Sequence, residues 1–340
     1  MKKKITHPLL FILLITFIIF ILHQQATINT TTSMNSAAGW LVGQQNKDGS
    51  ISLSDNSMFK IWDTANAVVV LSLLDKSYYN ETINKSVRFL NIVKRSNGSF
   101  YMTTTAKEDY CIETTAVSLI ALNLVDENIS DTRNFLANKQ NVKGYWEIGT
   151  PFIIVDKRFP SVTGYAVVAL ALTDGGSNTK HITFNITKAL DFIASTQLED
   201  GSWGSSPMYY DTPYYATYVD VWAAELYDRN EIIEKALGFV LRTQNSDGSW
   251  GSSAKGRPSK ELRTALALNT LLVSDTCEKN EKCKKRIEKG VQWLIKKQRP
   301  DGSWNGGYFV GTEKKEDIYA TTMAMLALIR YKNMYKNPMG

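Results

Sequence analysis

Histidine and cysteine are scarce in this chain, and their scarcity excludes several kinds of site. The 340 residues include three histidines, His7, His23 and His181, two of which lie within the first 23 residues. A histidine-rich metal centre is therefore excluded. The sequence also lacks a Gly-rich phosphate cradle and an Asp-Asp-x-x-Asp motif for magnesium. We therefore predict that the protein holds no metal and no cofactor.

An excess of charge of one sign is also missing. The chain has 39 Lys and Arg against 33 Asp and Glu, a net charge of +6, and Lys2, Lys3 and Lys4 contribute half of that excess. No basic stripe with interleaved aromatic residues stands out. Nucleic acid is therefore not an expected partner.

The three cysteines allow one disulfide. Cys277 and Cys283 flank a short charged loop and are able to pair in an oxidising compartment. We predict this disulfide. Cys111 would then be unpaired, either as a reactive thiol or, as we favour, as a small buried apolar residue.

The one long apolar run lies at the amino terminus. Three lysines precede apolar residues 8–22, a length near the upper limit of a signal peptide core and short for a membrane span. We predict a signal peptide or signal anchor over residues 1–25 and a linker over residues 26–35. The lysines stay inside, so the rest of the chain should be extracytoplasmic, either secreted or membrane-anchored.

The remainder is organised around one repeated pattern, which we call the turn phrase. An aromatic residue is followed five positions later by Gln, then four later by Gly, then two later by a second aromatic residue. Six copies occur, with Lys94 in place of Gln in the second and Ile51 in place of the last aromatic in the first; their glycines are Gly49, Gly98, Gly144, Gly201, Gly248 and Gly302. Repetition at 46 to 57 residues predicts an array of structural units.

Each part of the turn phrase has a physical interpretation. The residues before each Gln show helical periodicity with one apolar face, as in residues 232–240. The Gly supplies the positive backbone angle that ends a helix. The Gln amide is expected to bond the last free carbonyls of that helix, and the following Trp to cover the turn.

An apolar, Ala-rich helix is expected after each turn phrase. These helices are apolar almost all round and should be buried, whereas the first set is amphipathic. Five of them open on Thr and the fourth on Asp220; the segments are 64–74, 115–124, 163–172, 220–226, 264–272 and 321–329. Six helical hairpins in two concentric rings predict an all-α fold, an (α/α)6 toroid over residues 36–340.

The turn phrases resemble the QW repeats of squalene-hopene and oxidosqualene cyclases. The last unit is also similar to the β subunits of protein prenyltransferases, and the resemblance covers about residues 36–332. In those cyclases the central Asp of an Asp-x-Asp-Asp motif donates a proton. Aligned on Asp63, this chain has Trp62 at the donor position. Standard squalene-type cyclisation is therefore not supported.

The resemblance to prenyltransferases implies a zinc site that this chain does not complete. Asp220 matches the Asp ligand of that family, but Trp222 takes the Cys position and Ala320 the His position. Zinc-dependent prenyl transfer is therefore not expected.

Candidate site residues gather where the inner helices begin. Asp63, Glu113 and Asp220 are the candidate catalytic acids, and Glu261 and Asp317 open two other helices. Acids among aromatic faces suit protonation of an alkene and stabilisation of the resulting cation. Alternatively, the acids cap helices and the aromatic residues fill the core. The candidate ligand-binding residues are Trp62, Tyr110, Tyr165, Tyr218, Trp222, Arg263 and Tyr319, with Tyr214, Tyr215, Tyr308 and Phe309 nearby.

Three hypotheses for function follow. The first, which we favour, is a membrane-associated terpenoid cyclase-like toroid that binds, and in one version transforms, an isoprenoid or other apolar or extended ligand in its central cavity. The second is an extracellular protein or hydrolase that binds carbohydrate or peptide. The third is a non-catalytic surface scaffold.

Overall fold

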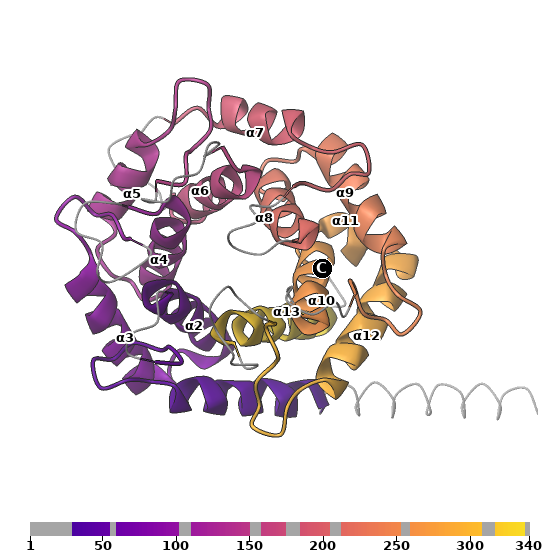
Figure 1. Ribbon diagram of the computed structural model, residues 1–340, viewed down its shortest axis with the longest axis horizontal. Helices are drawn as coiled ribbons and strands as arrows, with labels where there is room; N and C mark the ends of the chain where they lie inside the picture. The colour runs from indigo at the N-terminus through magenta and orange to yellow at the C-terminus, as the bar shows by residue number, and fades with distance from the viewer. Residues whose placement is uncertain are drawn as a thin grey trace, which may run out of the picture.

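The computed structural model describes residues 29–54, 59–101, 110–149, 158–174, 184–204, 212–252, 259–307 and 317–336. Helices dominate these ranges and form two concentric rings (Figure 1). The inner ring comprises α2 (Lys60–Asp75), α4 (Ile112–Leu124), α6 (Pro160–Leu172), α8 (Pro213–Glu225), α10 (Lys260–Leu272) and α13 (Ile318–Lys336). The outer ring comprises a helix over residues 29–43, α3 (Asn80–Val93), α5 (Ser130–Asn138), α7 (Ile186–Ser195), α9 (Asn230–Arg242) and α12 (Glu281–Lys296), with the short α11 (Asp275–Glu278) before α12.

The inner ring is closed. Each inner helix packs against the next, from α2 to α4, α6, α8, α10 and α13, and α13 packs back against α2. The predicted α/α toroid of six hairpins is therefore confirmed.

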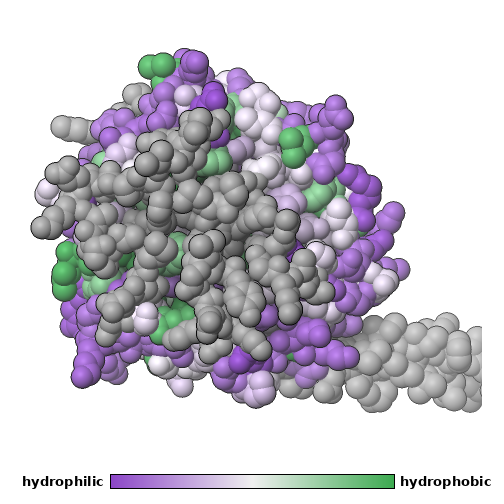
Figure 2. All heavy atoms as spheres, in the orientation of Figure 1, coloured by the Kyte–Doolittle hydropathy of each residue, from purple (hydrophilic) through white to green (hydrophobic). Residues whose placement is uncertain are grey.

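Burial follows the predicted difference between the rings. In α4 every residue from Ile112 to Leu122 is buried. In α9 only one face is buried, which includes Ile232, Leu237 and Phe239. Figure 2 shows the consequence: the rim of the face in view is mostly hydrophilic, with scattered hydrophobic residues.

The glycine of each turn phrase lies where no other residue fits. All six have a φ between +86° and +99°. A Cβ at Gly201 would stand 2.2 Å from the carbonyl oxygen of Lys235 on the next outer helix. The glycine therefore serves both the turn and its close approach to the neighbouring hairpin.

The Trp side chain, and not the Gln side chain, makes the hydrogen bond that we predicted for Gln. The Trp Nε1 donates to a carbonyl at the end of its own helix, as Trp203 does to Ile193 (2.9 Å). The Gln Nε2 instead donates to a carbonyl at the start of the next outer helix, at 2.9–3.0 Å. The prediction for Gln was wrong because a single repeat does not reveal its neighbour. The last of these bonds, from Gln298 to Ser33, closes the outer ring.

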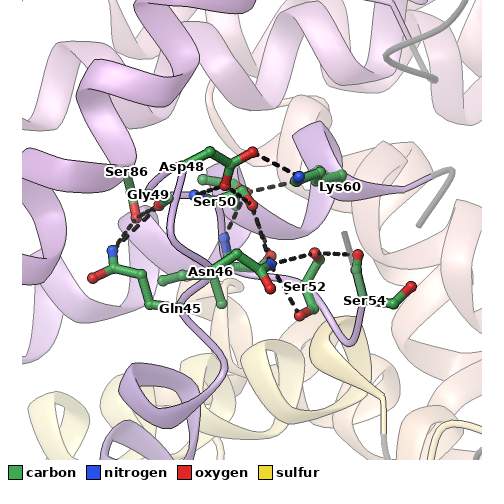
Figure 3. A network of polar contacts seen from close by, with 11 residues as sticks. Gln45, Asn46, Asp48, Gly49, Ser50, Ser52, Ser54, Lys60 and Ser86 are labelled. Carbon is green, nitrogen blue, oxygen red and sulfur yellow. Dashed lines mark hydrogen bonds and ion pairs between the residues drawn. The ribbon is translucent and has the colours of Figure 1, made fainter. Parts of the chain in front are cut away.

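Figure 3 shows the first of these turns. Gln45 donates to Ser86 of α3 (3.1 Å), and Asp48 accepts from the Ser50 hydroxyl (2.6 Å) and pairs with Lys60 of α2 (2.6 Å). The turn therefore ties an outer helix to its neighbour and to the inner ring.

A Thr in every inner helix binds the preceding turn, and this contact corrects the fourth helix. The residue that ends the turn phrase donates its backbone N–H to this Thr, which we call the opening Thr, at 2.9–3.3 Å. The six are Thr64, Thr115, Thr163, Thr217, Thr264 and Thr321. In the fourth inner helix, α8, which begins at Pro213, Thr217 and not Asp220 makes this contact, so Asp220 lies almost one turn further along the helix.

The described residues include only part of the amino-terminal region for which we made predictions. Residues 29–35, which we predicted as linker, are helical, with Thr30, Ser33 and Met34 buried. The reason is that one face of this helix packs into the ring and Ser33 bonds Gln298 (2.7 Å). The predicted signal peptide or anchor, residues 1–25, lies outside the described residues. Within the described ranges, no helix combines the length and hydropathy needed to cross a bilayer.

The cysteines are arranged as the sequence suggests. Cys277 and Cys283 are joined in a disulfide with their Cα atoms 5.2 Å apart. Cys111 is unpaired and buried, and burial raises the pKa of its thiol to about 11. Such a thiol is not activated as a nucleophile at neutral pH.

Candidate functional site

The position two residues before each opening Thr forms a common level in the inner ring. The residues at this level are Trp62, Glu113, Ser161, Tyr215, Leu262 and Tyr319. Several of them touch partners on helices that are not neighbours in the ring. Tyr215 of α8 bonds Glu113 of α4, and its ring lies 6.3 Å from that of Tyr319 of α13. Contacts across the ring mean that these side chains meet at its centre.

Glu113 is the acid of this central cluster. It is 2% exposed, and its Oε1 accepts hydrogen bonds from the Tyr215 hydroxyl (2.9 Å) and the Ser161 hydroxyl (3.1 Å). Oε2 bonds no residue of the described chain. Burial raises the pKa of Glu113 to about 7, against the two hydrogen bonds, which lower it.

Asp220 is a second buried acid, and it lacks a hydrogen-bonding partner. Its side chain is fully buried, and neither carboxylate oxygen bonds any residue of the described chain. Burial, followed by the charge of Glu113, holds its pKa well above the usual range. Gly164 of α6 leaves room for it, since a Cβ there would stand 2.4 Å from Asp220 Oδ1. Burying an unpartnered carboxyl destabilises the fold, so packing does not explain Asp220.

Asp63 and Asp317 lie at the starts of the neighbouring helices α2 and α13. Asp317 caps α13, because its Oδ1 accepts from the backbone N–H of Ala320 (2.8 Å). Asp63 is 8% exposed, and no capping bond joins its side chain to α2. Burial, and then the charge of Asp317, raises the pKa of Asp63 well above its usual range. Asp317 therefore caps its helix by a hydrogen bond, whereas Asp63 and Glu113 lie in the first turns of α2 and α4 without a capping hydrogen bond among the described residues, and Asp220 lies beyond the first turn of α8.

Aromatic rings surround the acids in the centre. Trp62 lies 5.5 Å from both Tyr165 and Tyr319, centroid to centroid, and Tyr165 lies 6.1 Å from Tyr215. The Tyr165 and Tyr319 hydroxyls are 3.5 Å apart. Each of these four rings is no more than 6% exposed. The centre thus combines aromatic faces and edges with buried carboxyls.

The remaining predicted ligand-binding residues lie apart from the central cluster or outside the described residues. Tyr218 and Trp222 stack at 5.7 Å in a second cluster, with Arg330. Tyr110 lies outside the centre, against Phe135 and under Lys139. Arg263 donates to the Ser252 carbonyl (2.6 Å) beside the fifth turn and is not brought into the central cluster. Tyr308 and Phe309 lie outside the described residues.

Sequence reasoning missed Ser161 and Arg330 and did not single out Tyr215. A signal for Ser161 and Tyr215 was present, because both stand two residues before an opening Thr. Arg330 stands nine residues after its own opening Thr, where no repeat pattern marks it. Within the described residues, no group of three or more His, Cys, Asp or Glu side chains is placed to hold a metal ion.

The closed double ring with an acid and aromatic rings at its centre defines the chain as a toroid of the terpenoid cyclase and prenyltransferase class. Two family models match it: the squalene-hopene cyclase C-terminal domain over residues 152–333, and the prenyltransferase alpha-alpha toroid domain over residues 12–146. The first spans more than half of the chain, and the protein belongs to that family. No curated protein matches the chain.

Solved structures share the fold at low sequence identity. The type II terpene cyclase MstE from Scytonema, in complex with geranylgeranyl dihydroxybenzoate, is 18% identical with a TM-score of 0.73, over 92% of this chain and 99% of MstE. The ent-copalyl diphosphate synthase from Streptomyces platensis is 20% identical with a TM-score of 0.58, over 79% of this chain and 50% of its own. A GH76 α-mannanase from Bacteroides thetaiotaomicron is 12% identical with a TM-score of 0.64, over 91% and 96% of the two chains. Proteins of unlike chemistry share the architecture, so function must be argued from the site.

Proposed function

We propose that the toroid binds an isoprenoid at the centre of its inner ring and isomerises it by proton-initiated cyclisation, with Glu113 as the acid. One observation carries the proposal: a protonatable carboxyl is buried among aromatic rings at the level of the cyclase donor. Trp62 takes that position on α2, two residues before Thr64, and Glu113 stands at the same level on α4, two residues before Thr115. Among the six residues at this level, Glu113 is the one acid.

The environment of Glu113 suits proton donation. A pKa of about 7 leaves a large fraction of Glu113 protonated at neutral pH. The hydrogen bonds from Tyr215 and Ser161 stabilise the carboxylate that remains after transfer. Burial, and then the charge of Glu113, raise the pKa of Asp220 and so favour its neutral form.

The reaction balances without a cofactor. The Glu113 proton adds to one carbon of a terminal double bond, and the other carbon becomes a cation that the next double bond attacks. The rings of Trp62, Tyr165 and Tyr319 offer electron-rich faces to that cation, each contributing up to about 2 kcal/mol in a desolvated site. A proton lost from the final cation leaves a product isomeric with the substrate. MstE is a type II terpene cyclase solved with a geranylgeranyl substrate, and this likeness favours a prenyl chain here too.

The test is turnover of a panel of prenyl alcohols, acids and phosphates in D2O. The wild type should give an isomer of one substrate that carries a single deuterium. Glu113→Gln should lower the rate by at least about 10²-fold, because an amide cannot donate the proton. Glu261→Gln is the matched control: Glu261 lies in the first turn of α10, half-buried and outside the cluster, and its rate should not change. Equal rates for Glu113→Gln and the wild type would remove Glu113 from the mechanism.

We also propose that the protein works outside the cytoplasm, tethered or secreted through residues 1–25. The support is the sequence alone: three lysines before the apolar run of residues 8–22. In this setting the apolar ligand reaches the ring from the membrane. Protease added to intact cells should digest residues 36–340, whereas complete protection would place the toroid in the cytoplasm.

A further inference from the structure

A second cluster on the inner ring surrounds Arg330. This residue lies on α13, and its guanidinium carbon stands 4.8 Å from the ring centroid of Trp222 and 5.4 Å from that of Tyr218. Its Nη1 donates to the Tyr218 hydroxyl (3.2 Å) and to Asn269 Oδ1 (2.9 Å). Asn269 is itself fixed, since its Nδ2 donates to the carbonyls of Ala265 and Met323. Side chains of α8 and α10 thus hold the guanidinium in one place.

Arg330 pairs with no acidic side chain of the described residues, unlike two other arginines of this protein. The buried Arg133 pairs with Asp174 (2.7 Å), and Arg229 pairs with Asp191 and Glu231. Across the described residues no carboxylate pairs with Arg330, and its Nε and Nη2 make no hydrogen bond. A guanidinium has five N–H donors. Nη1 makes both hydrogen bonds of Arg330, so the N–H groups of Nε and Nη2 on this half-buried side chain are available to an anion.

The Arg330 cluster lies on the same axis as the central acid. Tyr215, which bonds Glu113, and Tyr218, which bonds Arg330, stand one turn apart on α8. Trp222 and Asn269 each lie five residues after their opening Thr, whereas Glu113 lies two before its own. Seven residues of helix correspond to about 10 Å along the ring. Tyr165 links the two levels: burial, and then the neighbouring Tyr218, raise the pKa of its hydroxyl.

We infer that Arg330 binds an anionic head group, a carboxylate or a phosphate, at the end of the prenyl chain opposite to the double bond that Glu113 protonates. This inference rests on the proposed function and specifies its substrate class. The planar guanidinium matches either group with paired N–H donors. Its contacts to Trp222 and Tyr218 leave it rigid, so little entropy is lost on binding. The head group would fix the register of the chain and so select which double bond meets Glu113.

The experiment compares three ligands of equal chain length on the full-length protein: geranylgeraniol, its carboxylic acid and its monophosphate. For the wild type, we expect at least one anionic ligand to bind about 10- to 100-fold more tightly than the alcohol, as for charge-assisted hydrogen bonds. Arg330→Gln should reduce this ratio to about 1 and change the dissociation constant of the alcohol less than 3-fold. Arg330→Lys keeps the charge without the fork and should give an intermediate ratio.

The control and the contrary outcomes separate this inference from the proposed function. Arg242→Gln removes the same charge from the outer helix α9, where Arg242 donates to the Asp200 carbonyl, and should leave the ratio unchanged. Which anion binds more tightly decides between carboxylate and phosphate. Equal binding of alcohol and anions by the wild type, or an equal loss for all three in Arg330→Gln and Arg330→Lys, would overturn the head-group site while the isoprenoid site stands. Failure of all three ligands to bind the wild type would overturn both.

Discussion

Acidic residues in the outer turns and at the centre of the inner ring have opposite electrostatic surroundings. In the fifth turn, Asp247 accepts from the Ser249 hydroxyl (2.6 Å) and backbone N–H (3.0 Å). The hydroxyl bond, with the other donors around it, holds the pKa of Asp247 well below its usual range. At the centre, burial raises the pKa of Glu113 and of Asp220. The surroundings of the same functional group therefore favour the ionised form in the turns and the protonated form in the centre.

This contrast separates architecture from chemistry. The Asp and Ser of the turn recur in four repeats, at Asp48, Asp200, Asp247 and Asp301, each bonded to the Ser two residues later. Their donors account for them completely. Asp220 has no donor and Glu113 has too few to offset its burial, so both are a burden to the fold. Residues that folding does not explain are the ones to assign to function.

Replacing the glycine of a turn should give the largest loss of stability. Gly201→Ala places a Cβ 2.2 Å from the carbonyl oxygen of Lys235 at a φ of +89°, so the turn must move away from α9. We expect the free energy of unfolding to fall by more than about 3 kcal/mol, measured by urea denaturation. Gly204→Ala, three residues on, meets no atom within 4 Å and should cost less than about 0.5 kcal/mol. Similar losses for both variants would refute this account of the turn.

Substitution of the central acid should change stability in the opposite direction, because removing the Glu113 carboxyl stabilises the fold. Glu113 titrates near 4.5 when unfolded and near 7 when folded. Below about pH 4 Glu113 is protonated in both the folded and the unfolded protein and does not lower the free energy of unfolding. As the pH rises from 4.5 to 7, the free energy of unfolding of the wild type falls. The difference of about 2.5 pKa units corresponds to about 3 kcal/mol. Glu113→Gln should therefore be more stable than the wild type by up to about 3 kcal/mol at pH 8 and not at pH 4. A variant less stable at pH 8 would mean that the carboxylate supports the fold.

The contact between Thr217 of α8 and the fourth turn should give an intermediate effect on stability. Thr217→Val keeps the shape but removes the oxygen that accepts the Trp203 backbone N–H (3.3 Å), which leaves a buried donor unpaired. We expect a loss of about 2 kcal/mol in thermal or chemical unfolding. Thr212→Val provides a comparison at the cap of the same helix, where the backbone N–H of Tyr214 loses its acceptor. A loss well below 1 kcal/mol at Thr217 would show that its hydroxyl does not hold the fourth turn against α8.

Substitution of a single acid in one of the turns should have the smallest effect on stability. Asp247→Asn keeps one acceptor for Ser249 but weakens the pairing with Lys260 (3.2 Å), on a side chain that is 47% exposed. A loss of about 1 kcal/mol is expected at pH 7. The lowered pKa means that this contribution is present above pH 4 and disappears as the acid protonates below it. The pH dependence should therefore run opposite to that of Glu113→Gln, and the same dependence in both variants would remove the contrast.

The architecture could be predicted from sequence because it repeats. Helix periodicity, the six glycines and the alternation of amphipathic with apolar helices all report local requirements, and each occurs six times. The hydrogen-bond acceptor of Gln197 could not be predicted, because that acceptor, the Ile232 carbonyl, belongs to the next hairpin. Asp220 was misplaced because a buried acid resembles a first-turn acid until its distance from Thr217 is counted.

The candidate site could be predicted from the sequence only in part, for a related reason. Glu113 was proposed as one acid among several, and its level in the ring becomes evident only by counting from Thr115. Tyr110 and Arg263 were included for residue type and position near a helix start, but their side chains turn toward Phe135 and Ser252. The place of Arg330 in the ring depends on how far α13 extends past Thr321, and no local sequence pattern predicts that length.

The central claim is that Glu113 keeps its proton near neutral pH. Its most direct test is a ¹³C NMR titration of the protein labelled at the Glu carboxyl carbon, with the Glu113 signal identified by its absence in Glu113→Gln. We predict a midpoint near pH 7 for this signal, and the same midpoint in the Glu261→Gln control. A midpoint near the ordinary value of 4.5 would show that Glu113 is ionised in the folded protein and cannot be the acid that starts the reaction.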